Sequence, residues 1–276
     1  MTTLRANPEL VWFSVMMVVA SSIVAGVAGS LAWGGSHATL WLLGHELVAA
    51  APESVAQRAA ISGGLLTWFA AHLAAPFFGV ALARATLEAL AQRPWTVSGS
   101  LGESWRRMPS IATYAVLDAS VGGLLGRLRR GHGRGGSKLA AQLLGLAWWA
   151  ATYLTLPVLA REPRGGMAAV SRSTTLMRET WKEAFVGRLV LGWIWLPLGV
   201  LAGLPLAICL ALGIESKLVL ALAVVLPSIG MAALIVVLRT LDTIYRCALY
   251  VFATEGVVPE PFDDPELEEI WCVRPQ

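Results

Sequence analysis

The chain has 276 residues, of which 56% are hydrophobic and 14% are charged, and its formal net charge is +3. Charged residues make up about a quarter of a soluble domain, so this composition excludes an ordinary soluble fold and indicates an integral membrane protein. The cations are spread over many short connections, which excludes the basic stripe of a nucleic-acid-binding protein.

The amino terminus carries one cation, Arg5, ahead of an apolar run over residues 11–33. A secretory signal needs only about 7–15 apolar residues, and this run is longer, so we expect a first membrane span that is retained. Small residues over 25–30 leave signal cleavage as the alternative.

Five apolar runs are long enough to cross the bilayer, which takes about 20 helical residues. They cover residues 11–33, 60–83, 139–160, 189–213 and 218–238. A sixth run, 110–126, is shorter and holds Asp118 near its middle. Whether this run crosses decides the side of every later segment.

The distribution of cations favours a crossing by residues 110–126. With the amino terminus inside, six spans place 14 of the 21 lysines and arginines in the cytoplasm, whereas a re-entrant segment places 11 there. The positive-inside rule therefore predicts an all-α protein with six spans in three hairpins and both termini cytoplasmic. The basic loop over residues 127–138 is then external and departs from the rule.

An internal repeat supports the same layout. Residues 68–76 and 149–157 share the pattern W-x-A-x-x-L-x-x-P, and each is followed by V-S-x-S and then by E-[ST]-W-[RK]. Each copy is followed by a surface helix, and the two surface helices lie on the same side of the membrane only if both copies cross in the same direction. This again requires residues 110–126 to cross. Chance matching in apolar, alanine-rich sequence is the alternative.

Amphipathic helices are expected on the cytoplasmic surface over residues 97–108 and 165–186. At about 100° per residue, Met167, Val170 and Met177 fall on one face of the second helix, with charged residues opposite. We expect it to lie on the membrane surface, with an ordinary helix on a soluble core as the alternative. Candidate contacts with anionic lipid headgroups or a partner are Trp105, Arg106, Arg107, Arg127, Arg129, Arg130, Arg172, Arg178, Trp181 and Lys182.

Small residues recur every four positions in four of the expected spans, a spacing that lets helix backbones approach closely. They are Ser22, Gly26 and Ser30; Ala71, Ala75, Gly79 and Ala83; Gly122 and Gly126; and Gly199 and Gly203. Contacts inside one bundle explain this pattern, and a subunit interface is the alternative.

Two ionisable residues, His72 and Asp118, lie inside expected spans. An acid at mid-membrane costs roughly 2.5–3.5 kcal/mol, so such residues are functional candidates. If the second and third spans are neighbours, the two side chains could pair along a proton or ion path, and a structural hydrogen bond is the competing interpretation. Helix kinks are predicted at Pro76, Pro157, Pro197, Pro205 and Pro227.

Motifs of catalysis are incomplete in this sequence. His45-Glu46 begins like a zinc-protease helix, but Ala49 stands where the second histidine belongs. Residues 131–138 are glycine-rich and basic, but their order differs from that of a phosphate-binding loop and no strand precedes them. We therefore expect no enzyme, no metal and no cofactor.

Helix is expected to continue beyond the sixth span to about residue 254, the end of a single transmembrane domain. There Arg239, Asp242 and Arg246 have i,i+3 and i,i+4 spacing, which predicts a cytoplasmic ion-pair ladder rather than a substrate site. Residues 255–276 form an acidic cytoplasmic tail. We expect it to dock on the protein's own basic helices, with a partner protein as the alternative.

Residues 244–263, IYRCALYVFATEGVVPEPFD, resemble a family of bacterial multi-pass membrane proteins whose tail reads roughly I-F-[RK]-x-A-L-Y-x-Y-A-T-x-G-x-V-P with a following F-D. Residues 148–157 and 173–181 also look like that family, and Phe252 stands where the family more often has tyrosine. The resemblance implies a six-span inner-membrane fold with no assigned activity.

Two functions remain open from the sequence. The first is a non-catalytic scaffold or accessory subunit of an inner-membrane complex, with amphipathic helices and small-residue faces as contact surfaces for other subunits, for a second copy or for lipid. The alternative is a small transporter or channel for a neutral or lipid-like solute, with His72 and Asp118 as its polar gate.

Overall fold

The computed structural model describes residues 7–20, 53–130, 136–178, 203–205, 207–209, 211–212 and 216–259. Over these residues the chain is helical and has no strand. Several predicted features lie outside the described residues: most of the spans at 11–33 and 189–213, the end of the surface helix at 179–186, the loop 131–135, the tail from residue 260, His45, the Arg130 side chain, Trp181, Lys182 and Pro197.

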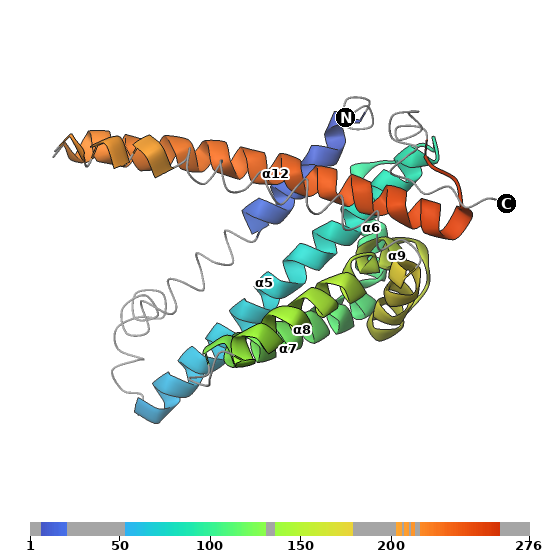
Figure 1. The fold of residues 1–276 in the computed structure, drawn as a ribbon, viewed down its shortest axis with the longest axis horizontal. Helices are drawn as coiled ribbons and strands as arrows, with labels where there is room; N and C mark the ends of the chain where they lie inside the picture. Colours follow the sequence, from blue (N-terminus) through green and yellow to red (C-terminus); the bar gives the residue numbers. More distant parts are fainter. Residues whose placement is uncertain are drawn as a thin grey trace.

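The described helices include η1 (Pro8–Leu10) leading into a helix over 11–20, α5 (Glu53–Leu90), α6 (Val97–Arg106), α7 (Met108–Arg130), α8 (Gly136–Thr152), α9 (Thr155–Arg161), a helix over 166–178, and α12 (Lys217–Glu255). From α5 to the helix over 166–178, they follow one another with short connections (Figure 1). α5 packs against α6, α7, α9 and α12, and α7 packs against α8.

Within the part of the chain that the structure describes, four stretches of helix are long and apolar enough to cross a membrane. They are His72–Leu90, Met108–Arg129, Lys138–Arg161 and Leu218–Glu255. The chain is therefore a membrane protein by the length and composition of its helices. The run predicted at 110–126 belongs to α7, which is longer at both ends and qualifies among the four.

Two helix boundaries follow from capping. Thr96 caps the amino terminus of α6, since its Oγ1 accepts a hydrogen bond from the backbone N–H of Gly99 at 3.1 Å. α12 ends at Gly256, which has a φ of 71° and donates its N–H to the carbonyl oxygen of Phe252 at 2.9 Å. Glycine adopts this left-handed conformation without steric cost, so the chain leaves the helix there.

The core of the bundle surrounds the carboxyl-terminal half of α5. One cluster joins α5 to α7, α9, the helix over 166–178 and α12 through buried side chains that include Val80, Leu87, Ile111, Tyr153, Leu159, Leu176 and Leu249. A second cluster joins another face of α5 to the amino-terminal helix through Leu10, Phe13, Ala81, Leu82, Ala85 and Ile244. α5 therefore holds the other helices together.

The helix over 166–178 packs partly on the protein itself. Val170, Leu176 and Met177 are buried in the core, whereas Met167 is exposed. Its first residue, Gly166, lies against the backbone of α7, where an added Cβ would lie 2.5 Å from the Tyr114 nitrogen. Part of the apolar face predicted to lie on lipid therefore contacts the bundle.

The amino-terminal half of α12, orange in Figure 1, lies away from α5, α7 and α8. Its large apolar side chains are exposed, with Leu218 at 70% and Leu226 at 63%. An apolar helix of this kind is expected to face lipid or another membrane helix.

Candidate functional site

One end of the bundle carries seven arginines and three glutamates joined by ion pairs, which we call the arginine collar. Its members are Arg84, Arg93, Arg106, Arg107, Arg161, Arg164 and Arg172 with Glu88, Glu103 and Glu162. The carboxylates neutralise fewer than half of the guanidinium groups. The collar therefore keeps a positive charge that attracts anions.

Glu162 is the junction of the collar. Its Oε1 accepts hydrogen bonds from Tyr250 Oη at 3.1 Å and Arg172 Nε at 3.4 Å, and its Oε2 pairs with Arg164. Burial alone would raise the pKa of Glu162, but the hydrogen bonds from Arg164, Tyr250 and Arg172 lower it below its ordinary value. Glu162 is thus ionised at neutral pH and joins α12 to the start of the helix over 166–178.

The predicted lipid contacts divide into exposed and internal residues. Trp105 and the Arg106 side chain are 68% and 82% exposed, so both are free to meet a headgroup. Arg107 instead donates through Nη1 to the carbonyl oxygens of Leu159 at 2.7 Å and Glu162 at 2.6 Å. Arg107, the residue between α6 and α7, therefore holds this junction against the end of α9.

The remaining predicted contacts lie at both ends of the bundle. Arg172 contacts Glu162, and Arg178 is exposed at the end of the described part of its helix. Arg127 and Arg129 are exposed near the carboxyl end of α7, the end opposite Arg107.

An open pocket of about 190 Å³ lies between the amino-terminal helix, α5, α7, α9 and α12. Its polar lining is Ser14, Tyr114, Asp118, Arg239, Asp242, Thr243 and Arg246, and its apolar lining includes Pro76, Gly79 and Leu156. The pocket thus brings Asp118 together with the predicted ladder on α12. His72 does not line it.

Charges in this pocket are only partly paired. Asp242 and Arg246 form an ion pair at 2.6 Å, as the ladder predicted, whereas Arg239 forms no ion pair with any described residue. Asp118 accepts a hydrogen bond from Trp148 Nε1 at 2.9 Å. Arg239 is therefore the guanidinium group in this pocket that remains available to a solute or to water.

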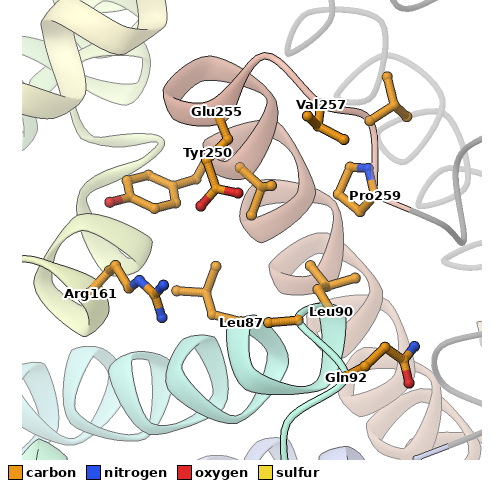
Figure 2. A pocket seen from close by; sticks show the side chains of 11 residues that line it. Leu87, Leu90, Gln92, Arg161, Tyr250, Glu255, Val257 and Pro259 are labelled. Carbon is orange, nitrogen blue, oxygen red and sulfur yellow. The ribbon is translucent and has the colours of Figure 1, made fainter.

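A second pocket, of about 490 Å³, opens at the collar end and is drawn in Figure 2. Leu87 and Leu90 line it from α5, Arg161 from the end of α9, and Tyr250, Val251 and Glu255 from α12, with Val257, Val258 and Pro259 beyond. Arg161 and Glu255 reach into it (Figure 2), while the Tyr250 hydroxyl donates a hydrogen bond to Glu162. We call this second pocket the collar pocket.

Gln92 also lines the collar pocket and has a φ of 54°. A left-handed conformation is uncommon for a residue other than glycine and recurs at ligand-binding positions.

Among the described residues, no group of three His, Cys, Asp or Glu side chains is placed to hold a metal ion.

Residues 65–259 match a family of unknown function, DUF6159, and this match takes in well over half of the 276 residues. The chain belongs to this family. Within the DUF6159 match lie the arginine collar and the collar pocket. Comparison with curated proteins and with solved structures gave no match.

The segment that carried the resemblance has structural uses in this DUF6159 protein. Arg246 contacts Tyr153 in the turn between α8 and α9, Tyr250 contacts Glu162, Gly256 ends α12, and Pro259 lines the collar pocket. The sequence singled out Arg106, Arg107 and Arg172 of the arginine collar but did not predict that Glu88 and Glu162 pair with its arginines. The i,i+4 spacing of Arg84 and Glu88 was available as a signal, whereas Glu162 and Tyr250 are separated by 88 residues.

Proposed function

We propose that the chain is a non-catalytic scaffold or accessory subunit of a larger assembly in a bacterial inner membrane. In this proposal it crosses the membrane six times, as three hairpins, with both termini in the cytoplasm. It meets anionic headgroups through the exposed Trp105 and Arg106 and meets other subunits through its helix faces.

Contacts between distant segments support this topology. Trp95 Nε1 donates to Asn7 Oδ1 at 3.2 Å, Arg107 reaches Leu159, and Tyr250 reaches Glu162. The amino terminus, the segments that follow α5 and α9, and the end of α12 thus meet at one end of the bundle. That end carries the arginine collar, and the positive-inside rule assigns such an end to the cytoplasm.

Reporter fusions test the orientation. A fluorescent protein that matures only in the cytoplasm is expected to be bright after residue 107, after residue 164 and at the carboxyl terminus, and dark within residues 131–135. A bright fusion within 131–135 would contradict the crossing by α7.

The observation that carries the scaffold proposal is a difference between two small-residue stripes. On α5, a Cβ at Gly79 would lie 2.9 Å from Leu156 Cδ1, so α9 already fills that notch. On α7, a Cβ at Gly122 would meet no atom of the described residues within 4 Å, and Gly123 is equally open. The α7 notch therefore allows a helix of another subunit to approach closely.

Purification in mild detergent tests this notch. The parent protein is expected to migrate as a complex larger than one chain, and Gly122→Leu is expected to release the monomer because the bulky side chain fills the notch. Gly102→Leu on α6 is the matched control, since Gly102 is also open but lies outside the candidate spans. A parent protein that is monomeric without any partner would contradict the proposal.

The pocket that Asp118 lines favours a second candidate function, a small transporter or channel. It brings together Asp118 and Arg239, two charged residues from the apolar helices α7 and α12, and charged residues in such helices are functional candidates. Flux of glycerol and of a short-chain fluorescent phospholipid into proteoliposomes tests this function. We expect Asp118→Asn to reduce flux, with His72→Ala as the control because His72 does not line this pocket, and unchanged flux in Asp118→Asn would exclude Asp118 from transport.

A further inference from the structure

The collar pocket lies where two candidate membrane spans end. The stretches His72–Leu90 and Lys138–Arg161 each finish at a residue that lines it, and α12 reaches it with the part that continues beyond the predicted span 218–238. The pocket is therefore at the boundary between apolar and polar surface, which in a bilayer is the level of the lipid headgroups.

The walls of the collar pocket are mostly apolar. Leu87, Leu90, Val251, Val257 and Val258 line it together with Pro259 and Ala91. Walls of this kind suit a glycerol backbone and the first methylene groups of acyl chains, and a volume of about 490 Å³ is in the range of pockets that bind small organic groups.

Two opposite charges face this apolar space. Arg161 has a 36% exposed side chain, and its ion pair with Glu88 is long, at 3.8 Å. Glu255 is exposed and forms no ion pair or hydrogen bond with any described residue. The two are not paired with each other, and both reach into the pocket (Figure 2).

We propose that the collar pocket binds the headgroup of a phospholipid with a primary amine, of the phosphatidylethanolamine type. Arg161 holds the phosphate, and Glu255 accepts hydrogen bonds from the ammonium group. A guanidinium group matches phosphate geometry, and a carboxylate matches a primary ammonium, so the two charges in the pocket suit the two charges of this headgroup.

The same charges discriminate against other lipids. An anionic headgroup without an ammonium leaves Glu255 unpaired next to a second negative charge. A choline headgroup has a quaternary ammonium without N–H donors and forms no hydrogen bond with Glu255. This inference rests only on the membrane location of the chain, so it survives if the protein has no partner subunit.

Native mass spectrometry of the full-length, delipidated protein in detergent tests the proposal. Phosphatidylethanolamine, phosphatidylglycerol and phosphatidylcholine with identical acyl chains are titrated separately. We expect one phosphatidylethanolamine to bind about tenfold more tightly than either other lipid, because one charge-assisted hydrogen bond differs between them. Equal binding of the three, or binding of phosphatidylglycerol alone, would overturn the proposal.

Two charge variants separate the two contacts. Arg161→Gln is expected to weaken the binding of phosphatidylethanolamine about tenfold, because the contact with the phosphate is lost. Glu255→Gln is expected to remove the preference over phosphatidylcholine. Arg93→Gln and Glu9→Gln are matched controls, since both residues are exposed and neither lines the pocket. If the control variants bind phosphatidylethanolamine as weakly as the pocket variants do, the lipid is held by general charge attraction and the proposed site is rejected.

A third variant leaves the charges intact. Val257 is 61% exposed at the pocket, and Val257→Trp fills the space without changing a charge. It is expected to weaken phosphatidylethanolamine binding while the protein stays folded, whereas unchanged binding would place the lipid elsewhere. Soluble phosphoethanolamine added in excess is expected to compete poorly, and full competition would show that the ligand is a free solute and not a lipid.

Discussion

Two segments with the same W-x-A-x-x-L-x-x-P pattern have different structures. In the first, α5 continues as one helix from Glu53 through Pro76 to Leu90. In the second, the helix stops at Thr152 and restarts at Thr155, so that Pro157 lies in the first turn of α9. The pattern alone does not decide whether the helix breaks.

The surroundings of the second segment explain the difference. Proline has no N–H, so Pro157 leaves the Tyr153 carbonyl without its helical partner. Arg246 Nη1 donates to that oxygen at 3.4 Å, and the backbone N–H of Leu154 donates to Ser173 Oγ at 3.0 Å. Arg246 also lies 4.5 Å from the centre of the Tyr153 ring. Groups freed by the break thus find partners on α12 and on the helix over 166–178, as apolar surroundings require.

Arg246→Met is expected to have the largest effect on this break. It removes the donor to Tyr153 and leaves Asp242 without its partner in a half-buried site, which we expect to cost about 3 kcal/mol of unfolding free energy. Thermal unfolding in detergent measures it. The control is Arg239→Met on the same helix, because Arg239 forms no ion pair with a described residue, and equal losses in both variants would contradict the role of Arg246.

Gly166→Ala is expected to cause the second-largest loss of unfolding free energy. The added Cβ would lie 2.5 Å from the Tyr114 nitrogen and 2.7 Å from the Ser110 carbonyl oxygen, so the helix that carries Ser173 must move away from α7. Overpacking against backbone costs roughly 1–3 kcal/mol. Gly165→Ala is the matched control, since a Cβ there meets nothing within 4 Å, and a similar loss in that variant would exclude close packing as the cause.

Ser173→Ala tests the other half of the break. It leaves the buried N–H of Leu154 without an acceptor and is expected to cost about 1 kcal/mol in the same unfolding measurement. Ser171→Ala, on the exposed side of the same helix, is expected to be nearly neutral. Faster amide exchange at Leu154 in Ser173→Ala would locate the effect at the break, and unchanged exchange would contradict it.

Local features of the chain were predictable from the sequence, and contacts between distant segments were not. The apolar run around Asp118 predicted a helix, and the spacing of Asp242 and Arg246 predicted their ion pair. Arg239 has equally suitable spacing but forms no ion pair with a described residue. Spacing along one helix therefore does not decide which of two arginines pairs with Asp242. Arg246 and Tyr153 are separated by 93 residues, so nothing in the sequence around Arg246 indicated its contact.

The candidate sites show the same limit. Asp118 was identified because an acid inside an apolar run is costly, and the structure adds the pocket that it shares with Asp242. The collar pocket was missed, since Arg161 and Glu255 come from two helices that are far apart in the sequence. Charged residues at the ends of spans are common, and only the packing of the spans shows which of them share a pocket.

Replacing each proline is expected to have the smallest effect and compares the two segments directly. Pro157→Ala restores an N–H that competes with Arg246 for the Tyr153 oxygen, so we expect α8 and α9 to become more continuous with less than about 1 kcal/mol change in stability. In Pro76→Ala the helix is already continuous, so its course should stay the same. Spin-label distances between the ends of α8 and α9, and between matched positions on α5, measure both. An unchanged distance across α8 and α9 would mean that Arg246 and Ser173, rather than Pro157, hold the break open.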